Sequence, residues 1–159
     1  TMAKAERILD ELHVPFVINQ NRYSILDRSV ENNGLLKQTY ASGKGLICFS
    51  PLAQGMLTDR YLNGIPQDSR IRTDGRFLQE KTVQAKMQKI QQLNEIAKER
   101  GESLAQMALK WVRKDEDVTS VLIGASKPEQ ILENLKVLES AAFTKEELEK
   151  IDEIVLKEN

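Results

Sequence analysis

Short apolar runs alternate along this chain with longer segments in which apolar residues recur every three or four positions. Three short runs, at 16–20, 45–50 and 120–124, are almost continuously apolar, which is typical of parallel strands covered on both faces. The longer segments predict amphipathic helices. The order is helix, strand, helix, strand, a long segment with two helices, strand, helix, helix. We therefore predict a single α/β domain over 1–159, built from parallel β/α units.

Several helix ends can be predicted from capping residues. Ser103 and Thr144 each precede an apolar helical stripe and have Gln or Glu three residues later, which is the pattern of a capping box. A helix over 81–100 is expected to stop at Gly101. The stripes of these helices contain Val83, Met87, Ile90, Leu93 and Ala97; Leu104, Met107, Ala108, Trp111 and Val112; and Leu148, Ile151, Ile154 and Val155.

Composition narrows the classes of partner. Lys and Arg total 23 against 24 Asp and Glu, a formal net charge of -1, so the overall charge favours neither nucleic acid nor an anionic membrane as a partner. No apolar stretch approaches the roughly 20 residues that span a bilayer, and no signal pattern opens the chain. The single cysteine, Cys48, lies in an apolar run and is expected to be a small buried hydrophobe. We expect a soluble, cytoplasmic protein.

Common cofactor and metal motifs are missing. The sequence has neither GxGxxG after a strand nor GxxxxGK[ST], and one histidine and one cysteine at unrelated positions do not predict a metal site. His13 stands between a predicted helix and a strand start. Chemistry in parallel α/β folds collects at the carboxyl ends of strands, so we expect His13 to be structural or exposed.

Polar segments follow each predicted strand. Gln20 ends the first strand, where an amide either binds a planar carboxamide or caps the loop. Phe49 ends the second and either stacks on a flat ring or packs in the core. Pro51 removes a backbone donor and leaves neighbouring amides free to face a ligand.

The segment after the third predicted strand suggests an anion site. Ser126 with Glu129 forms the pattern of a capping box, and Pro128 fits the first helical turn. Free amides and the helix dipole there favour a phosphate, and Lys127 adds a positive charge. A capped helix without a ligand is the alternative.

The stretch from 51 to 80 is long and rich in turn residues, so it is a candidate functional loop. Its arginines suit phosphate oxygens, but interspersed aspartates fit a solvated mixed-charge surface equally well. These residues are Arg60, Arg70, Arg72 and Arg76, with Asp59, Asp68 and Asp74.

Four strings, in this order, resemble the aldo-keto reductase family, in the branch that includes voltage-gated potassium channel β subunits and bacterial glyceraldehyde 3-phosphate reductases. They occupy 16–23, 49–58, 61–66 and 123–134, and the match covers essentially the whole chain. The resemblance implies the C-terminal part of a (β/α)8 TIM barrel that binds NADPH and reduces aldehydes or ketones.

The resemblance also implies residue roles. Gln20 would hold the carboxamide and Phe49 would stack on the nicotinamide. The pyrophosphate would be lined by Ser50, Pro51, Leu52, Ala53 and Gln54, with Arg60 and Arg70 near phosphates; the adenosine and its 2'-phosphate would be surrounded by Gly124, Ser126, Gln130, Glu133 and Asn134. Many family members have a lysine and an arginine where this sequence has Gly124 and Gln130. Preference for NADP over NAD therefore rests on Ser126, Lys127, Gln130 and Arg70.

The family's catalytic Asp, Tyr, Lys and His come from the first half of the barrel, whereas this chain is expected to begin at the helix before the sixth strand. Tyr23, Tyr40 and Tyr61 match none of those positions, so we predict no catalytic residue and no hydride transfer by the chain alone. Three strands of an eight-strand barrel would leave two open edges and an uncovered interior face, which favour self-association or pairing with a missing N-terminal half. A non-catalytic dinucleotide- or partner-binding module, or a truncated remnant, remains an alternative.

Overall fold

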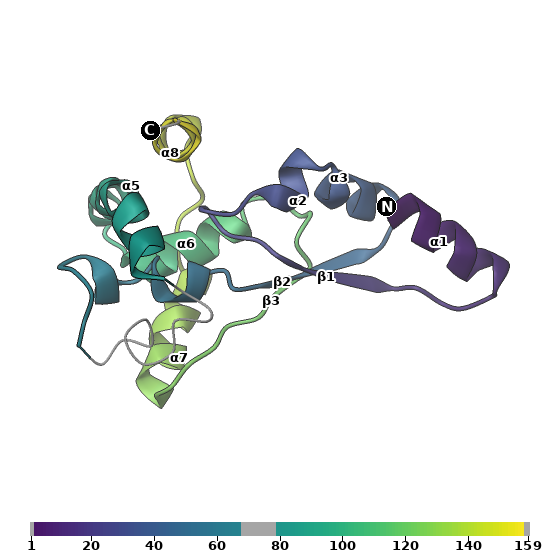
Figure 1. The fold of residues 1–159 in the computed structure, drawn as a ribbon, viewed down its shortest axis with the longest axis horizontal. Helices are drawn as coiled ribbons and strands as arrows, with labels where there is room; N and C mark the ends of the chain where they lie inside the picture. Colours follow the sequence, from purple (N-terminus) through teal and green to yellow (C-terminus); the bar gives the residue numbers. More distant parts are fainter. Residues whose placement is uncertain (1, 68–78, 158–159) are drawn as a thin grey trace.

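Three parallel strands form the centre of the molecule (Figure 1). The structure is a computed structural model that describes residues 2–67 and 79–157. The strands are β1 (Ile18–Arg22), β2 (Gly45–Phe49) and β3 (Ser120–Val121), in the order β1-β2-β3. The predicted parallel α/β arrangement is confirmed.

The edges of the predicted strands need correction. β1 starts two residues later than the apolar run and extends through Asn21 and Arg22, because these polar residues pair with Cys48 and Phe49 of β2. β3 is only two residues long, although the N–H of Leu122 still donates to the carbonyl of Cys48 at 2.8 Å. Backbone pairing, rather than hydropathy, sets both limits.

The predicted helices are present, with their capping boxes at Ser103 and Thr144. The helix between β1 and β2 is divided at Gly34, which has a φ of 75°. The long helix ends at Glu99, with Arg100 as its C-cap, and Gly101 follows with a φ of 70°, as predicted. The helices are α1 (Met2–Glu11), α2 (Ser29–Asn32), α3 (Leu35–Ala41), α5 (Glu80–Glu99), α6 (Leu104–Val112), α7 (Pro128–Leu135) and α8 (Lys145–Leu156); 3₁₀ turns are η1 (Ala53–Gly55), η2 (Asp59–Tyr61) and η3 (Lys136–Leu138).

The core lies between one face of the sheet and the helices. Leu46 and Cys48 of β2 are fully buried in this core. The rings of Tyr23 and Trp111 pack there with their centroids 5.4 Å apart. The predicted apolar stripes of α5 and α6 supply the largest share of the rest. The stretch from 51 to 80 contributes more than its weak periodicity suggested, because Met56, Leu57 and Tyr61 join the core.

The opposite face of the sheet is open in the described chain. The apolar runs alone indicated strands covered on both faces, which is wrong here, whereas the uncovered interior face expected of a partial barrel is present. Ile18 is 42% exposed and Leu122 is 46% exposed. Neighbours in a parallel register share a face, and the pairs of Gln20 with Ile47 and of Arg22 with Phe49 lie on the open side. The sheet thus separates a buried helical side from an accessible side.

Gly45 allows the three strands to approach closely. A Cβ at this position would lie 3.0 Å from both Ile18 Cγ1 and Thr119 Oγ1, closer than side-chain carbons normally come. The Thr119 hydroxyl also accepts a hydrogen bond from the N–H of Leu46 at 3.2 Å. A glycine at this position therefore leaves room for Ile18 of β1 and for Thr119, the residue before β3.

Candidate functional site

The carboxyl ends of the three strands meet at one edge of the sheet, because the strands are parallel neighbours. In Figure 1 this edge faces α5, α6 and α7, whereas α1 and α3 lie toward the other end. The predicted site segments therefore start side by side. His13 is exposed and lies at the opposite end, before β1, as predicted.

The loop after β2 has an unusual backbone. Ser50, Ala53 and Gln54 have φ values of 54°, 48° and 60°, and His13 is the one other non-glycine residue in the described chain with a positive φ. Each such residue costs free energy, and positions of this kind cluster at ligand sites. No described group accepts a hydrogen bond from the N–H of Leu52 or Gln54. Two amides of this loop are therefore available to a ligand, as predicted next to Pro51.

A cavity of about 270 Å³ opens beside this loop. Ser50, Ala53 and Gln54 line it, so the structure brings three of the predicted residues together. Its other described lining residues are Arg22, Ser24, Leu26, Asp27, Met56, Gln79, Thr82 and Lys86.

Arg22 and Lys86 were not predicted as site residues. Arg22 follows Gln20 by two positions on a strand, so a period of two would have placed both on one face. Lys86 is on α5, far along the chain, and only the tertiary structure brings it to the cavity.

Gln20 and Phe49 lie on the open face of the sheet. Gln20 is exposed, and Phe49 is half-buried and outside the buried core. The guanidinium carbon of Arg22 lies 5.9 Å from the centroid of the Phe49 ring. An amide, an aromatic ring and a cation thus adjoin one another where β1 and β2 end.

The predicted cap after β3 is wrong. The N-cap of α7 is Lys127 rather than Ser126, and Glu129 makes no capping bond. Instead the side-chain oxygen of Gln130 accepts from the N–H of Ser126 at 2.8 Å and of Lys127 at 3.3 Å. The amides predicted to be free for a phosphate are therefore already hydrogen-bonded, since the longer Gln side chain folds back over the first turn.

The remaining predicted residues after β3 divide into exposed and anchored ones. Gly124, Ser126, Lys127 and Gln130 are exposed. Glu133 pairs with Lys136 at 2.6 Å, its backbone carbonyl accepts from Gln106 at 3.0 Å, and Asn134 is buried. None of the residues after β3 lines the described wall of the cavity.

Of the two arginines predicted to lie near phosphates, Arg60 is among the described residues and Arg70 is not. The backbone N–H of Arg60 donates to Thr58 Oγ1 at 3.3 Å, which caps η2. Arg70 lies outside the described residues, as do Arg72 and Arg76. Of the other predicted residues, Pro51 is buried and Leu52 half-buried.

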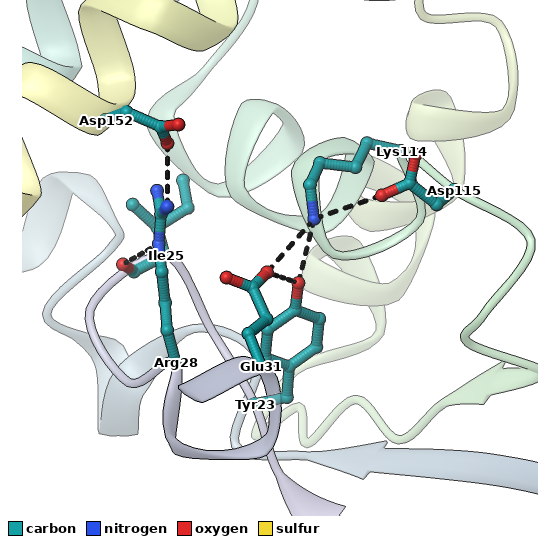
Figure 2. Close-up of polar contacts among 7 residues, drawn as sticks. All are labelled: Tyr23, Ile25, Arg28, Glu31, Lys114, Asp115 and Asp152. Carbon is teal, nitrogen blue, oxygen red and sulfur yellow. Dashed lines mark hydrogen bonds and ion pairs between the residues drawn. The ribbon is translucent and has the colours of Figure 1, made fainter. Parts of the chain in front are cut away.

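A polar cluster lies behind the strand ends, on the helical side (Figure 2). Tyr23, which follows β1, donates its hydroxyl hydrogen to Glu31 of α2 and accepts from Lys114 Nζ at 2.8 Å. Lys114 also contacts Glu31 at 3.3 Å and Asp115 at 3.4 Å. The cluster joins the ends of β1, α2 and α6.

Arg28 supports the same region. Its Nη1 pairs with Asp152 of α8 at 2.7 Å (Figure 2). Its guanidinium carbon lies 4.5 Å from the centroid of the Trp111 ring. The side chain of Lys114 approaches the same ring at 4.1 Å. Two cations thus cover one buried indole.

Burial raises the pKa of Tyr23 far above its ordinary value, and the hydrogen bond to Glu31 raises it further. The hydroxyl stays protonated at any physiological pH. Although a tyrosine beside a lysine is the pair that carbonyl reduction needs, Tyr23 is 0% exposed and lies on the helical side of the sheet. It is not placed to protonate a carbonyl at the strand ends.

Metal-ligating residues do not gather within 2–67 and 79–157, where no group of three or more His, Cys, Asp or Glu is found. Among the same residues, no helix combines the length and apolar character needed to cross a membrane.

Known proteins with similar sequences belong to one family. The family model described as the Aldo/keto reductase family matches residues 1–156. The chain is 46% identical over 154 residues to an L-glyceraldehyde 3-phosphate reductase of Escherichia coli K12, covering 94% of this chain and 44% of that protein. It is 40% identical over 144 residues to a putative voltage-gated potassium channel subunit beta of Schizosaccharomyces pombe, covering 87% and 42%.

The fold has a counterpart among solved structures. A glycerol dehydrogenase of Gluconobacter oxydans superimposes with a TM-score of 0.77 at 23% identity, covering 96% of this chain and 46% of that one. The chain therefore spans less than half the length of these relatives. Its three parallel strands and their helices correspond to part of a larger TIM barrel.

Proposed function

Because the chain belongs to the aldo/keto reductase family, we propose that it supplies the dinucleotide-binding part of an NADPH-dependent oxidoreductase that reduces aldehydes or ketones. The bound cofactor supplies the hydride, and the protein supplies binding and orientation. The observation that carries this proposal is the strained Ser50–Gln54 loop, which borders the open face where Gln20 and Phe49 lie.

The residues present fit such a cofactor. The amide of Gln20 can donate to and accept from a carboxamide, and the half-buried ring of Phe49 offers a stacking face on the same side of the sheet. The unbonded amides of Leu52 and Gln54 suit pyrophosphate oxygens. The segment Gly124 to Asn134 is proposed for the adenosine end, where Ser126, Lys127 and Gln130 are exposed.

The same residues do not provide a general acid. Tyr23 is buried in the polar cluster, Tyr61 is a core residue, and Tyr40 is exposed on α3 at the far end of the strands. Carbonyl reduction at neutral pH needs a group that protonates the developing alkoxide. We therefore propose that turnover requires residues from another part of the barrel.

The open sheet face supports the proposal that this chain associates with further barrel strands. Ile18, Leu122 and Ile123 expose apolar surface at the two edge strands and just beyond, which favours association with further barrel strands or with a second copy. A reducing, cytoplasmic setting is part of the proposal, because Cys48 is a free, fully buried thiol.

A second candidate is a module that binds the dinucleotide without turnover. The burial of Tyr23 favours this for the chain by itself, since the tyrosine that has a lysine partner is kept away from the open face. A shortened remnant that binds neither partner nor cofactor is the third reading.

Calorimetric titration of the 159-residue chain with NADPH and NADH tests the proposal. NADPH should bind, and Gln20→Ala should weaken it about tenfold, the effect of losing hydrogen bonds to the carboxamide. Gln84→Ala is the matched control, because Gln84 is exposed on α5 away from the cavity lining. Absence of binding at millimolar NADPH contradicts both binding hypotheses. Binding without oxidation of NADPH by an aldehyde favours the module.

A further inference from the structure

The cavity beside the Ser50–Gln54 loop has two cations and one acid among its described lining residues. Arg22 enters from the end of β1 and Lys86 from α5, and Asp27 is the acid. Within the described residues, neither Arg22 nor Lys86 has a carboxylate or a hydrogen-bond acceptor as a partner, and Arg22 contacts the Phe49 ring. The described lining therefore carries more positive than negative charge, and both cations face the cavity without a described ion-pair partner.

We infer that Arg22 and Lys86 form a phosphate-binding subsite in this cavity, together with the loop that contains Ser50, Ala53 and Gln54. The inference rests on the proposed function for the identity of the ligand. Neither Arg22 nor Lys86 is among the residues predicted from the sequence to contact the dinucleotide.

Lys86 is the more unusual of the two. It is half-buried, and a lysine in that position normally finds an acceptor for its ammonium group. Lys89, three residues further along α5, does so: its Nζ donates to the carbonyls of Val155 at 3.0 Å and Lys157 at 2.7 Å. Lys86 instead faces a cavity that supplies no carboxylate to it.

Asp27 offsets one of the two positive charges but forms no ion pair with either cation among the described residues. Its Oδ1 accepts a hydrogen bond from the N–H of Ser29 at 3.2 Å, so one oxygen is directed to the start of α2. Its own N–H donates to both the carbonyl and the hydroxyl of Ser24 at 3.1 Å. The carboxylate is thus hydrogen-bonded within the turn after β1, and the two cations of the described lining can both face a ligand.

A phosphate group suits these parts. A guanidinium fork binds two phosphate oxygens at once, an ammonium adds a point charge, and backbone amides can bind the remaining oxygens. The phosphate can come from the cofactor's pyrophosphate, or from a phosphorylated carbonyl substrate held beside Phe49. Arg22 adjoins that ring at 5.9 Å, so both sources are within the same region.

The test uses the 159-residue chain and three probes: inorganic pyrophosphate, inorganic phosphate and NADPH. Arg22→Gln and Lys86→Gln should each weaken pyrophosphate binding about tenfold, as expected for loss of one charged hydrogen bond. Lys81→Gln is the control, because Lys81 is exposed on the same helix and outside the cavity lining, and it should change affinity less than about twofold. Circular dichroism should be unchanged in all three variants, since no described ion pair or side-chain hydrogen bond holds Arg22 or Lys86 in the fold.

The NADPH arm identifies the source of the phosphate. Parallel weakening of NADPH and pyrophosphate assigns the subsite to the cofactor. Unchanged NADPH affinity, with phosphate binding to the NADPH-loaded chain weakened in the variants, assigns it to the substrate. The inference is overturned if the unmodified chain binds neither phosphate nor pyrophosphate, or if all variants bind them equally. Equal binding of phosphates with NADPH still weakened by Gln20→Ala leaves the proposed function standing without this subsite.

Discussion

Lys114 Nζ lies 2.8 Å from the hydroxyl oxygen of Tyr23, and the same hydroxyl donates a hydrogen bond to Glu31. The main chain of Tyr23 is equally engaged, because its N–H donates to the carbonyl of Phe49 at 3.3 Å and its carbonyl accepts from Cys48 Sγ at 2.9 Å. One residue therefore ties the ends of β1 and β2 to α2 and α6. The candidate site is built on this joint.

Lys114→Met should lower the free energy of unfolding by about 2 kcal/mol, because Glu31 and the Tyr23 oxygen lose their charged partner in a largely buried setting. The Lys114 side chain is 18% exposed. Urea unfolding measures the change, and Lys145→Met, at an 84% exposed side chain, should stay within about 0.5 kcal/mol. Equal midpoints for the two variants would show that the cluster contributes nothing to stability.

The thiol of Cys48 should be inert in the folded chain. Burial raises its pKa from 9.0 to about 12, although the hydrogen bond to the Tyr23 carbonyl partly opposes this. Because the folded pKa is the higher one, the thiol's contribution to stability is complete below pH 9 and declines as pH rises toward 12.

A thiol reagent at pH 8 should thus react with Cys48 only after unfolding. The control is an exposed thiol, Gln84→Cys in a Cys48→Ala background, which should react at once in the folded state. Rapid labelling of native Cys48 contradicts the burial described here.

Arg100→Ala should cost about 3 kcal/mol, since it leaves two partly buried carboxylates without their cation. Arg100 pairs with Glu147 at 2.6 Å and with Glu102 at 3.1 Å, and its side chain is 5% exposed. It joins the end of α5 to the capping box of α8. The exposed pair of Lys98 with Glu95 offers the comparison: Lys98→Ala should change the unfolding midpoint little, and a similar loss in both would refute the role of Arg100.

Gln130→Arg should shift cofactor preference toward NADPH over NADH. The substitution removes the oxygen that occupies the N–H groups of Ser126 and Lys127, and it adds a cation suited to a 2'-phosphate. The ratio of the two dissociation constants, measured by calorimetry, should rise several-fold in favour of NADPH. Gln130→Ala separates the two effects, because it frees the amides without adding charge. A ratio unchanged in both variants places the 2'-phosphate elsewhere.

Much of the fold was predictable because its signals are local. Ser103 and Thr144 cap their helices as their spacing indicated, and Gly101 ends α5 with a positive φ. The failures have a common origin. Ser126 and Glu129 matched a capping pattern, but Gln130 reaches the same amides, and a pattern of residue types does not rank competing side chains.

The site divides in the same way. Gln20 and Phe49 fall on one face because side chains alternate along strands and parallel neighbours share a register. The positive φ values of Ser50, Ala53 and Gln54 could not be predicted. Non-glycine residues disfavour this conformation, and only the surrounding structure stabilises it here.

By itself, the sequence determined the order of strands and helices, the caps at Ser103 and Thr144, and the approximate positions of the three strands. Only the tertiary structure decided which groups meet. Lys114 lies beside Tyr23 although 91 residues separate them along the chain, and Lys86 shares a cavity with Arg22 although it follows 64 residues later. The physical reason is that hydrogen bonds within a turn depend on local spacing, whereas contacts between elements depend on how the helices pack against the sheet.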